Sequence, residues 1–203
     1  MQLYSLFLLM AIVTVLSPGP GVVMTLTNAL RYGLRGTLGG ILGIAFGALV
    51  VAAISATSLG VVLATSALAF TILKFVGAAY LVYLGIRLWR APPFKFAEQS
   101  AHEANFGKRF LEGLSLQLTN PKAIFFFLSV FPQFIDPQQD YALQFTILVL
   151  TYSALVVVIH SSYAFFAKRA RAWLTSERGG RHVNRLAAAT FVFFGAALVT
   201  AER

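Results

Sequence analysis

The pentapeptide Ser-Pro-Gly-Pro-Gly occupies residues 17–21, near the middle of the first long apolar run of the chain. Pro18 and Pro20 have no amide hydrogen, so the carbonyls of Thr14 and Leu16 lose the partners that an uninterrupted helix would provide. The glycines between and after the prolines add backbone freedom. The pentapeptide therefore predicts a helix that breaks near its middle, with freed carbonyls that cannot face lipid and must be met by another helix, a side chain or water.

The whole chain has the composition of an integral membrane protein. Of its 203 residues, 58% are hydrophobic and 11% are charged, and the mean hydropathy is +0.77. Soluble domains carry about a quarter charged residues, so an ordinary cytoplasmic globule is excluded. The net charge of +9 would suggest nucleic acid as a partner of a soluble protein. In a membrane protein these charges belong in loops, and we expect no nucleic-acid partner.

Uncharged runs predict an all-α protein with six transmembrane helices, because about 20 apolar residues cross the hydrocarbon core. The expected spans cover about residues 3–30, 37–62, 67–88, 110–134, 141–167 and 184–201, the last of them short. Lys and Arg gather in the connections after the first, third and fifth spans. The positive-inside rule places these connections in the cytoplasm and both termini on the other side of the membrane.

The two halves of the chain resemble each other at an offset of about 100 residues. Phe7 precedes Ser17 by ten residues, as Phe110 precedes Asn120. Three helices are an odd number, so the second copy must enter the membrane from the opposite side, which predicts a 3+3 inverted repeat. We expect one transmembrane domain over residues 1–203, with repeat 1 over about 1–90, a cytoplasmic linker over about 91–108 and repeat 2 over about 109–203.

The fourth span contains a second break at the corresponding position. Pro121 follows Asn120, a candidate cap, and removes the helical partner of the Gln117 carbonyl. Two antiparallel spans with such breaks would point the positive ends of both restarted helices toward the midplane, where they suit an anion such as a carboxylate. Paired discontinuous helices indicate a transporter binding site. A pair of ordinary proline kinks is the alternative.

Ionisable side chains inside the spans add to this prediction. A lysine at a span centre costs about 2.5 to 3.5 kcal/mol on insertion scales, so Lys122 must be compensated by a lowered pKa, by freed carbonyls or by a substrate carboxylate. Lys74, Gln117 and His160 are further candidates for coupling or for supporting the site, although Lys74 could snorkel and His160 could be an ordinary hydrogen-bonded residue. The expected substrate site is Ser17, Pro18, Gly19, Pro20, Asn120, Pro121 and Lys122.

Other patterns indicate packing and exclude several kinds of chemistry. Gly39, Gly43 and Gly47 recur every four residues, a stripe that lets another helix approach closely. The chain has no cysteine, no paired intramembrane carboxylates and no nucleophile-elbow serine. We therefore expect neither an enzyme nor a metal site or cofactor.

Taken together, these motifs resemble the lysine exporter and homoserine/threonine resistance superfamily (LysE/RhtB) of small bacterial amino-acid exporters. The resemblance rests on SPGPG, the glycine stripe, LKFVGAAYLVYLGIRLWR at residues 73–90, NPKA at residues 120–123, and FPQFIDP at residues 131–137. It implies a multi-pass carrier of the bacterial cytoplasmic (inner) membrane. The carrier would use the proton motive force to export amino acids or close derivatives, with protons, membrane lipids and a homodimer as further partners.

Some members of this family that export basic amino acids have an acidic residue in the second span, whereas this chain has none between Arg35 and Lys74. The resemblance therefore favours a neutral substrate of the homoserine, threonine or leucine kind. Alternatives are an exporter of a basic amino acid or another small metabolite, a passive channel, and a membrane scaffold or assembly protein in which the prolines and glycines serve only packing. An efflux assay separates transport from the scaffold function.

Overall fold

The computed structural model describes residues 2–65, 67–92, 105–136, 138–167, 169, 172–173 and 176–200. This part of the chain is all-helical, as the composition predicts. Its elements in chain order are α1 (Gln2–Leu16), α2 (Pro20–Thr65), α3 (Ala67–Trp89), α4 (Phe106–Leu118), α5 (Pro121–Phe125), the π-helix η1 (Phe126–Val130), the 3-10 helix η2 (Phe131–Phe134), α6 (Tyr141–Phe165) and α8 (Glu177–Thr200).

Both expected helix breaks are present. The first expected span is divided at residues 17–19, between the end of α1 and the start of α2. The fourth is divided at residues 119–120, between α4 and α5, where the Asn120 side chain accepts the amide hydrogen of Lys122 as a cap. Prolines at the first position of α2 and α5 fit there because that amide has no helical partner anyway.

Three boundaries differ from the sequence-based expectation. The connection expected near Arg31 and Arg35 is reduced to Gly33, whose φ of 68° favours glycine, and helix continues on both sides of it. The helix of the sixth segment begins earlier than expected, because α8 starts at Glu177 and its 24 residues extend about 36 Å. The fourth segment does not restart as a regular α-helix, since α5 has five residues and continues as η1 and η2.

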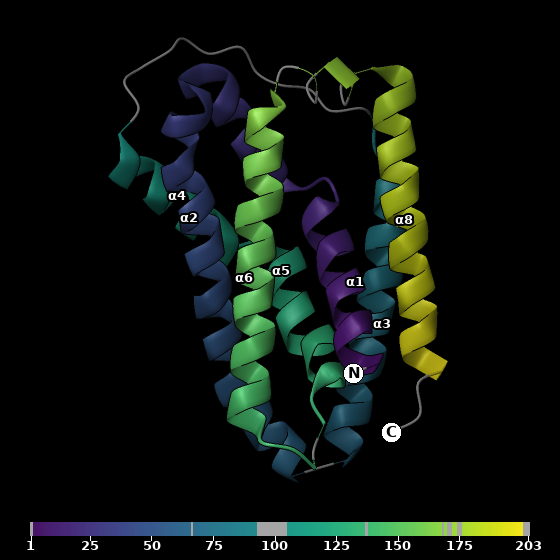
Figure 1. The fold of residues 1–203 in the computed structure, drawn as a ribbon. Helices are drawn as coiled ribbons and strands as arrows, with labels where there is room; N and C mark the ends of the chain where they lie inside the picture. Colours follow the sequence, from purple (N-terminus) through teal and green to yellow (C-terminus); the bar gives the residue numbers. More distant parts are fainter. Residues whose placement is uncertain are drawn as a thin grey trace.

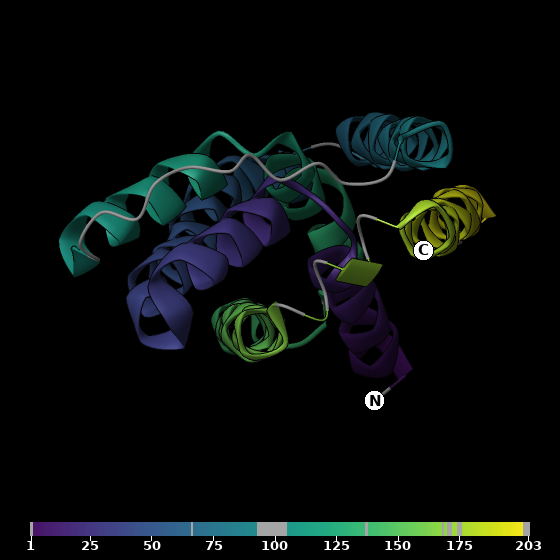
Figure 2. The same ribbon diagram turned by 90° about the horizontal axis from the view of Figure 1, so that it is seen from above.

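The helices form an elongated bundle (Figure 1). α2 rises from its start to the Gly33 kink at the upper end of the view and then descends, and α3, α6 and α8 run along the full height (Figure 1). Seen from above, α3 and α8 form one side of the bundle, α2, α4 and α6 form the other, and α1 lies between them (Figure 2). The main packing pairs are α2 with α4, α2 with α6, and α3 with α8.

The glycine stripe packs against α4, as the sequence predicts for a close helix partner. A methyl group on Gly43 would meet the carbonyl oxygen of Phe110, and one on Gly113 of α4 would meet the carbonyl oxygen of Gly40. The two backbones therefore approach each other more closely than a residue with a side chain at these positions would allow. This contact fixes α4, and with it the second break, against α2.

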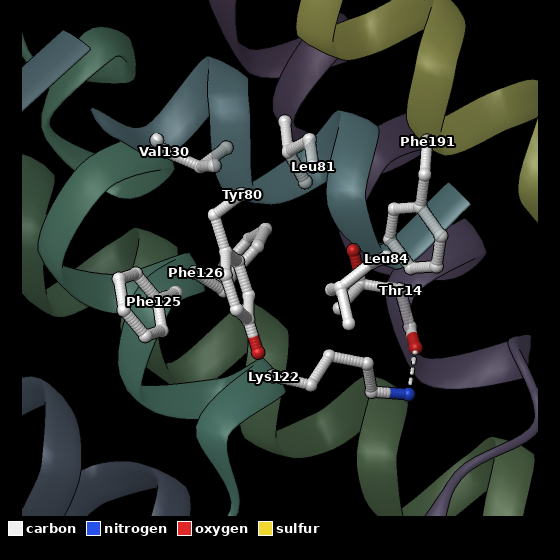
Figure 3. A pocket seen from close by; sticks show the side chains of 10 residues that line it. Thr14, Tyr80, Leu81, Leu84, Lys122, Phe125, Phe126, Val130 and Phe191 are labelled. Atoms are coloured by element: carbon white, nitrogen blue, oxygen red, sulfur yellow. Dashed lines mark hydrogen bonds between the residues drawn. The ribbon is translucent and has the colours of Figure 1, made fainter. Parts of the chain in front are cut away.

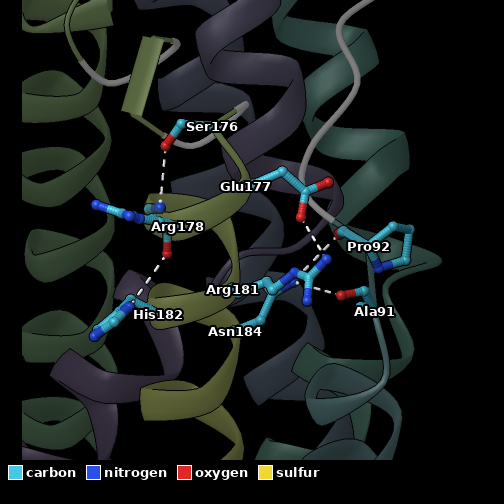
Figure 4. Close-up of polar contacts among 9 residues, drawn as sticks. Ala91, Pro92, Ser176, Glu177, Arg178, Arg181, His182 and Asn184 are labelled. Carbon is cyan, nitrogen blue, oxygen red and sulfur yellow. Dashed lines mark hydrogen bonds and ion pairs between the residues drawn. The ribbon is translucent and has the colours of Figure 1, made fainter.

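A polar contact joins α8 to the end of α3. The side-chain amide of Asn184 donates hydrogen bonds to the carbonyls of Ala91 and Pro92, at 3.2 and 3.3 Å. Arg181 pairs with Glu177 one turn away on the same helix (Figure 4). The two bonds from Asn184 satisfy backbone carbonyls just after the end of α3, so they hold the start of α8 beside α3.

The outer surface of the bundle is apolar. Exposed large hydrophobic side chains occur on several helices and include Leu9, Ile54, Leu68, Leu143 and Leu186. Exposed apolar surface on this scale suits a lipid environment rather than water. Within the described residues, Pro20–Ala56 and Tyr141–Phe165 are long and apolar enough to cross a membrane, and Tyr4–Leu16 and Phe75–Trp89 are shorter apolar helices. The number of spans stays a prediction.

Candidate functional site

Lys122 joins the two helix breaks. Its ammonium group donates to the carbonyl oxygen of Thr14 at 2.8 Å, to the carbonyl oxygen of Ser17 at 3.1 Å and to the hydroxyl of Ser17 at 3.0 Å. The side chain extends from the first turn of α5 across to α1 (Figure 3). All three ammonium hydrogens thus have acceptors. The ammonium group lies at the C-terminal end of α1, where the helix dipole is negative and attracts a positive charge.

Both carbonyls freed by the first break are met by side chains, as the sequence requires. The carbonyl of Thr14 accepts bonds from Lys122 and from the Ser17 hydroxyl, the latter at 2.9 Å. The carbonyl of Leu16 accepts a bond from the Tyr163 hydroxyl at 2.8 Å. The end of α1 is therefore attached to α5 and α6, which come from the other half of the chain.

The backbone groups at the two breaks find partners in different ways. The carbonyl of Gln117 is not left free, because it accepts the amide hydrogen of Asn120 at 3.2 Å in a tighter turn. The Ser17 hydroxyl donates to the carbonyl of Thr14 and accepts a bond from the Lys122 ammonium group, and no described amide of α2 donates to it. In the described part of the chain, the amides of Gly21 and Val22 consequently have no acceptor, and both residues line the cavity beside Lys122.

That cavity lies where the two breaks meet and has a volume of about 20 Å³. Its polar lining residues are Thr14, Gln117, Asn120, Lys122, Tyr152 and His160. A volume of this size holds about one water molecule, whereas pockets for small-molecule ligands measure about 300 Å³ or more. The cavity therefore gathers polar groups from both breaks but has no room for an amino acid in this structure.

His160 forms the α6 side of the cavity. Its Nδ1 lies 2.7 Å from the Thr25 hydroxyl of α2, and its imidazole is buried. A methyl group on Gly21 would lie 3.2 Å from the His160 Cε1 atom, so glycine at this position allows the imidazole to approach the start of α2. Lys122 and His160 are the two basic side chains in the lining of this cavity.

The opposite side of Lys122 is covered by aromatic and aliphatic side chains. Tyr80 stacks on Phe125, with ring centroids 3.8 Å apart, and both line a second small cavity of about 10 Å³ beside Lys122 (Figure 3). Leu84 and Phe191 continue this lining toward α8 (Figure 3). Water is thereby kept from the apolar stem of the lysine while its ammonium group points to α1.

The other residues predicted for the site lie at different places around the breaks. Pro18 is buried in the first break, and a methyl group on Gly19 would lie 3.2 Å from the Lys122 ammonium nitrogen. Pro20 and Pro121 are exposed and act through the backbone as helix starts. Lys74 belongs to α3, but its side chain lies outside the described residues.

Sequence reasoning missed Thr25 and Tyr152 and assigned no contact to Tyr163. Thr25 follows Gly21 by one helical turn, which places both on the face that meets His160. Tyr152 precedes His160 by eight residues and shares its side of α6. A search of α6 for polar residues at helical spacing from His160 would have found Tyr152.

Comparison with known proteins gives a consistent result. The model of the family described as "LysE type translocator" matches residues 12–202. A "Homoserine/homoserine lactone efflux protein" of Salmonella typhimurium is 36% identical over 97% of this chain and 95% of its own length, and the protein of the same name from Salmonella typhi is 35% identical with the same coverage. An "Uncharacterized membrane protein" of Vibrio cholerae serotype O1 is 36% identical over 97% of the chain and 96% of its own. No solved structure matches.

Proposed function

The chain belongs to the family of LysE type translocators, and we propose that it is a secondary-active exporter of neutral amino acids of the homoserine, threonine or leucine kind. Membership in this family makes it a membrane-integral translocator and not an enzyme. Relatives at 35 and 36% identity are named as efflux proteins for homoserine and homoserine lactone, which supports amino-acid efflux as the general activity. The proposal adds two points to this general activity, namely coupling to protons and a neutral substrate.

The contact of Lys122 with the end of α1 is the observation that carries the proposal. One ammonium group links two helix breaks that lie more than 100 residues apart in the chain, and it does so beside a cavity. A scaffold protein has no need for a buried charge at such a junction, because apolar side chains stabilise helix contacts at lower cost. A substrate carboxylate is the natural competitor for the ammonium hydrogens.

This competition supplies a mechanism for alternating access. A carboxylate that binds Lys122 must replace the oxygens of Thr14 and Ser17, because they already occupy all three hydrogens. Substrate binding therefore weakens the attachment of α1 to α5. The amides of Gly21 and Val22 provide further donors for the carboxylate, and His160 is placed to accept or release a proton as the site opens.

The lining of the cavity supports a neutral substrate. Its polar groups are donors, hydroxyls, amides and an imidazole, and no carboxylate belongs to the lining set. A cationic side chain such as that of lysine would meet Lys122 without a counter-charge and would be repelled. The α-carboxylate of a neutral amino acid has partners there, whereas its side chain would face the apolar residues Val15, Ile44 and Val156.

The proposal includes six spans arranged as a 3+3 inverted repeat in the bacterial cytoplasmic membrane, with the basic connections inside. The kink of α2, the end of α3 and the start of α8 lie at one end of the bundle, in agreement with this orientation (Figure 1). A single cysteine at Gln138 should react with a membrane-impermeant thiol reagent in intact cells, and one at Gln99, in the proposed cytoplasmic linker, should not. The reverse labelling would invert the orientation.

Efflux measurements test the function directly. Cells that overproduce the chain are loaded with dipeptides of homoserine, threonine, leucine or lysine, and the released amino acids are profiled outside the cells. Faster release of the neutral amino acids, lost on addition of a protonophore, supports the proposal. Release of lysine alone would overturn the neutral substrate, and unchanged profiles for all amino acids would favour a scaffold.

A further inference from the structure

A second group of polar side chains lies outside the cavity and has unused donors. Among the described residues, the buried side-chain nitrogens without an acceptor include Nδ2 of Asn28, Nη2 of Arg31 and Nε of Arg109. Asn28 is 4% exposed and Arg109 is 9% exposed. A buried donor without an acceptor is costly, and two such donors on neighbouring helices, with a third about one turn away, indicate a ligand whose acceptor atoms complete the site.

Asn28 and Arg109 approach each other from two helices, and Arg31 follows Asn28 by about one helical turn. Asn28 and Arg31 are three residues apart on the first segment of α2, so their side chains share a face. A methyl group on Gly40 would lie 3.4 Å from Nδ2 of Asn28 and 3.6 Å from the carbonyl oxygen of Arg109. The guanidinium of Arg109 lies over the ring of Tyr32, 5.0 Å from its centroid, next to Arg31 in the chain.

The region has an excess of positive charge. Arg109 Nη1 pairs with Glu112 at 2.8 Å, and the carboxylate of Glu112 is 39% exposed on the outer side of α4. This pair leaves the Nε atom of Arg109 and the Nη2 atom of Arg31 without acceptors. Two guanidinium groups and one carboxylate therefore leave one net positive charge beside the Asn28 amide. A carboxylate or phosphate group matches these donors in charge and in hydrogen-bonding geometry.

The group is connected to the cavity along both helices. The buried residues of α4 are Arg109, Gly113 and Gln117, four residues apart, and the last of them lines the cavity. Eight residues of helix separate Arg109 from Gln117, about 12 Å. On α2, Asn28 follows Gly21 by two turns, and Gly21 also lines the cavity. The two polar groups thus lie one after the other between the basic end of the bundle and its centre.

We propose that Asn28, Arg31 and Arg109 form an outer anion site that binds the carboxylate of the amino acid before the amino acid reaches the central cavity. This inference rests on the proposed function, because it assigns the first binding step of the same transport route. The basic end of the bundle is the end from which an exporter takes its substrate. The outer site selects for a carboxylate there, while Lys122 still holds α1.

Homoserine and homoserine lactone provide a matched pair of probes, because the lactone keeps the amino group and the carbon skeleton but has no free carboxylate. Binding is measured by titration calorimetry on the purified full chain in nanodiscs made of zwitterionic lipid. The variant Lys122→Met serves as background, since it removes the central ammonium group. We expect homoserine to bind this variant and the lactone to bind at least about tenfold more weakly.

Arginine variants in the same background locate the binding. Arg31→Gln should weaken homoserine binding by about tenfold, which is the effect of losing one charge-assisted hydrogen bond. Arg35→Gln removes an equal charge from an exposed residue four positions later and should leave the affinity unchanged. Equal affinities of the two variants, or equal binding of homoserine and its lactone, would overturn the inference.

Asn28→Asp tests the site without a ligand. The new carboxylate would supply the missing acceptor from within the chain, so this variant should unfold at a higher temperature than the wild type and should no longer bind homoserine in the Lys122→Met background. A lower unfolding temperature would contradict the excess of unpaired donors. This measurement does not depend on whether Arg31→Gln folds.

Inorganic phosphate and nanodiscs containing phosphatidylglycerol distinguish the source of the anion. Competition by phosphatidylglycerol together with absent homoserine binding would assign the site to a lipid headgroup and overturn the inference. The proposed function has a separate outcome, because absent efflux of every amino acid overturns it. Efflux that persists while Arg31→Gln and Arg35→Gln bind homoserine equally overturns only the outer site.

Discussion

Replacing Lys122 with methionine should abolish export and leave the fold intact. The substitution removes three hydrogen bonds to α1, but the carbonyl of Thr14 keeps its bond from the Ser17 hydroxyl. The carbonyl of Ser17 loses its side-chain donor, at a cost of about 1 to 3 kcal/mol for a buried group. Removing a lysine from the centre of a span returns about 2.5 to 3.5 kcal/mol. The two terms oppose each other, so the net effect should lie between a loss of about 0.5 and a gain of about 2.5 kcal/mol.

The assay combines thermal unfolding in detergent with export of homoserine from loaded cells at matched protein levels. Lys108→Met is the control, because Lys108 is exposed in the first turn of α4 and takes no part in the hydrogen bonds to α1. The control should export at the wild-type rate. Wild-type export by Lys122→Met would show that Lys122 only stabilises the end of α1, and recognition would then rest on Asn120 and the α2 amides.

Further substitutions test the remaining contacts. Lys122→Arg should fold and retain only a small part of the export, because a planar guanidinium does not match three converging acceptors; export at the wild-type rate in the same assay would refute this. Tyr163→Phe should cost about 1 kcal/mol by freeing the last carbonyl of α1, and unchanged unfolding would show that water replaces the hydroxyl. Pro121→Ala should insert normally and lose export as the break closes, whereas normal export would refute the broken-helix site. Gly43→Ala should destabilise by about 1 to 3 kcal/mol, while Gly107→Ala, whose methyl group would meet only Asn105 at 3.5 Å, should not lower the unfolding temperature comparably.

Local backbone rules predicted the breaks correctly because a proline acts on identifiable atoms. Pro18 frees the carbonyl of Thr14 whatever the rest of the fold does, and the need for a new donor follows from the low polarity of the surroundings. Which donor it is does not follow. Lys122 and Tyr163 reach α1 from positions more than 100 residues later, and only the packing of α5 and α6 brings them there.

Helix boundaries were less predictable where charged residues lie inside a helix. Arg31 and Arg35 indicate a connection, yet a single glycine with positive φ turns the chain and helix resumes at once. α8 starts at Glu177 because charged residues continue a helix beyond its apolar part, with Arg181 and Glu177 paired across one turn. Hydropathy reports the apolar part of a helix and not its ends, so the sixth segment was expected to be too short.

The small central cavity places a condition on any transport cycle. About 20 Å³ beside Lys122 admits a water molecule and no amino acid, so a substrate could bind there only after the contact between α1 and α5 separates. The bonds that close the site are the same bonds that a carboxylate would replace, because Thr14 and Ser17 occupy every hydrogen of the ammonium group. Closure without substrate and binding of substrate are therefore mutually exclusive. A ligand that binds one conformation more tightly than the other shifts the population toward it. An amino acid that reaches Lys122 would thus favour the conformation in which α1 is released, and this difference in binding is what a carrier needs in order to couple occupancy to movement.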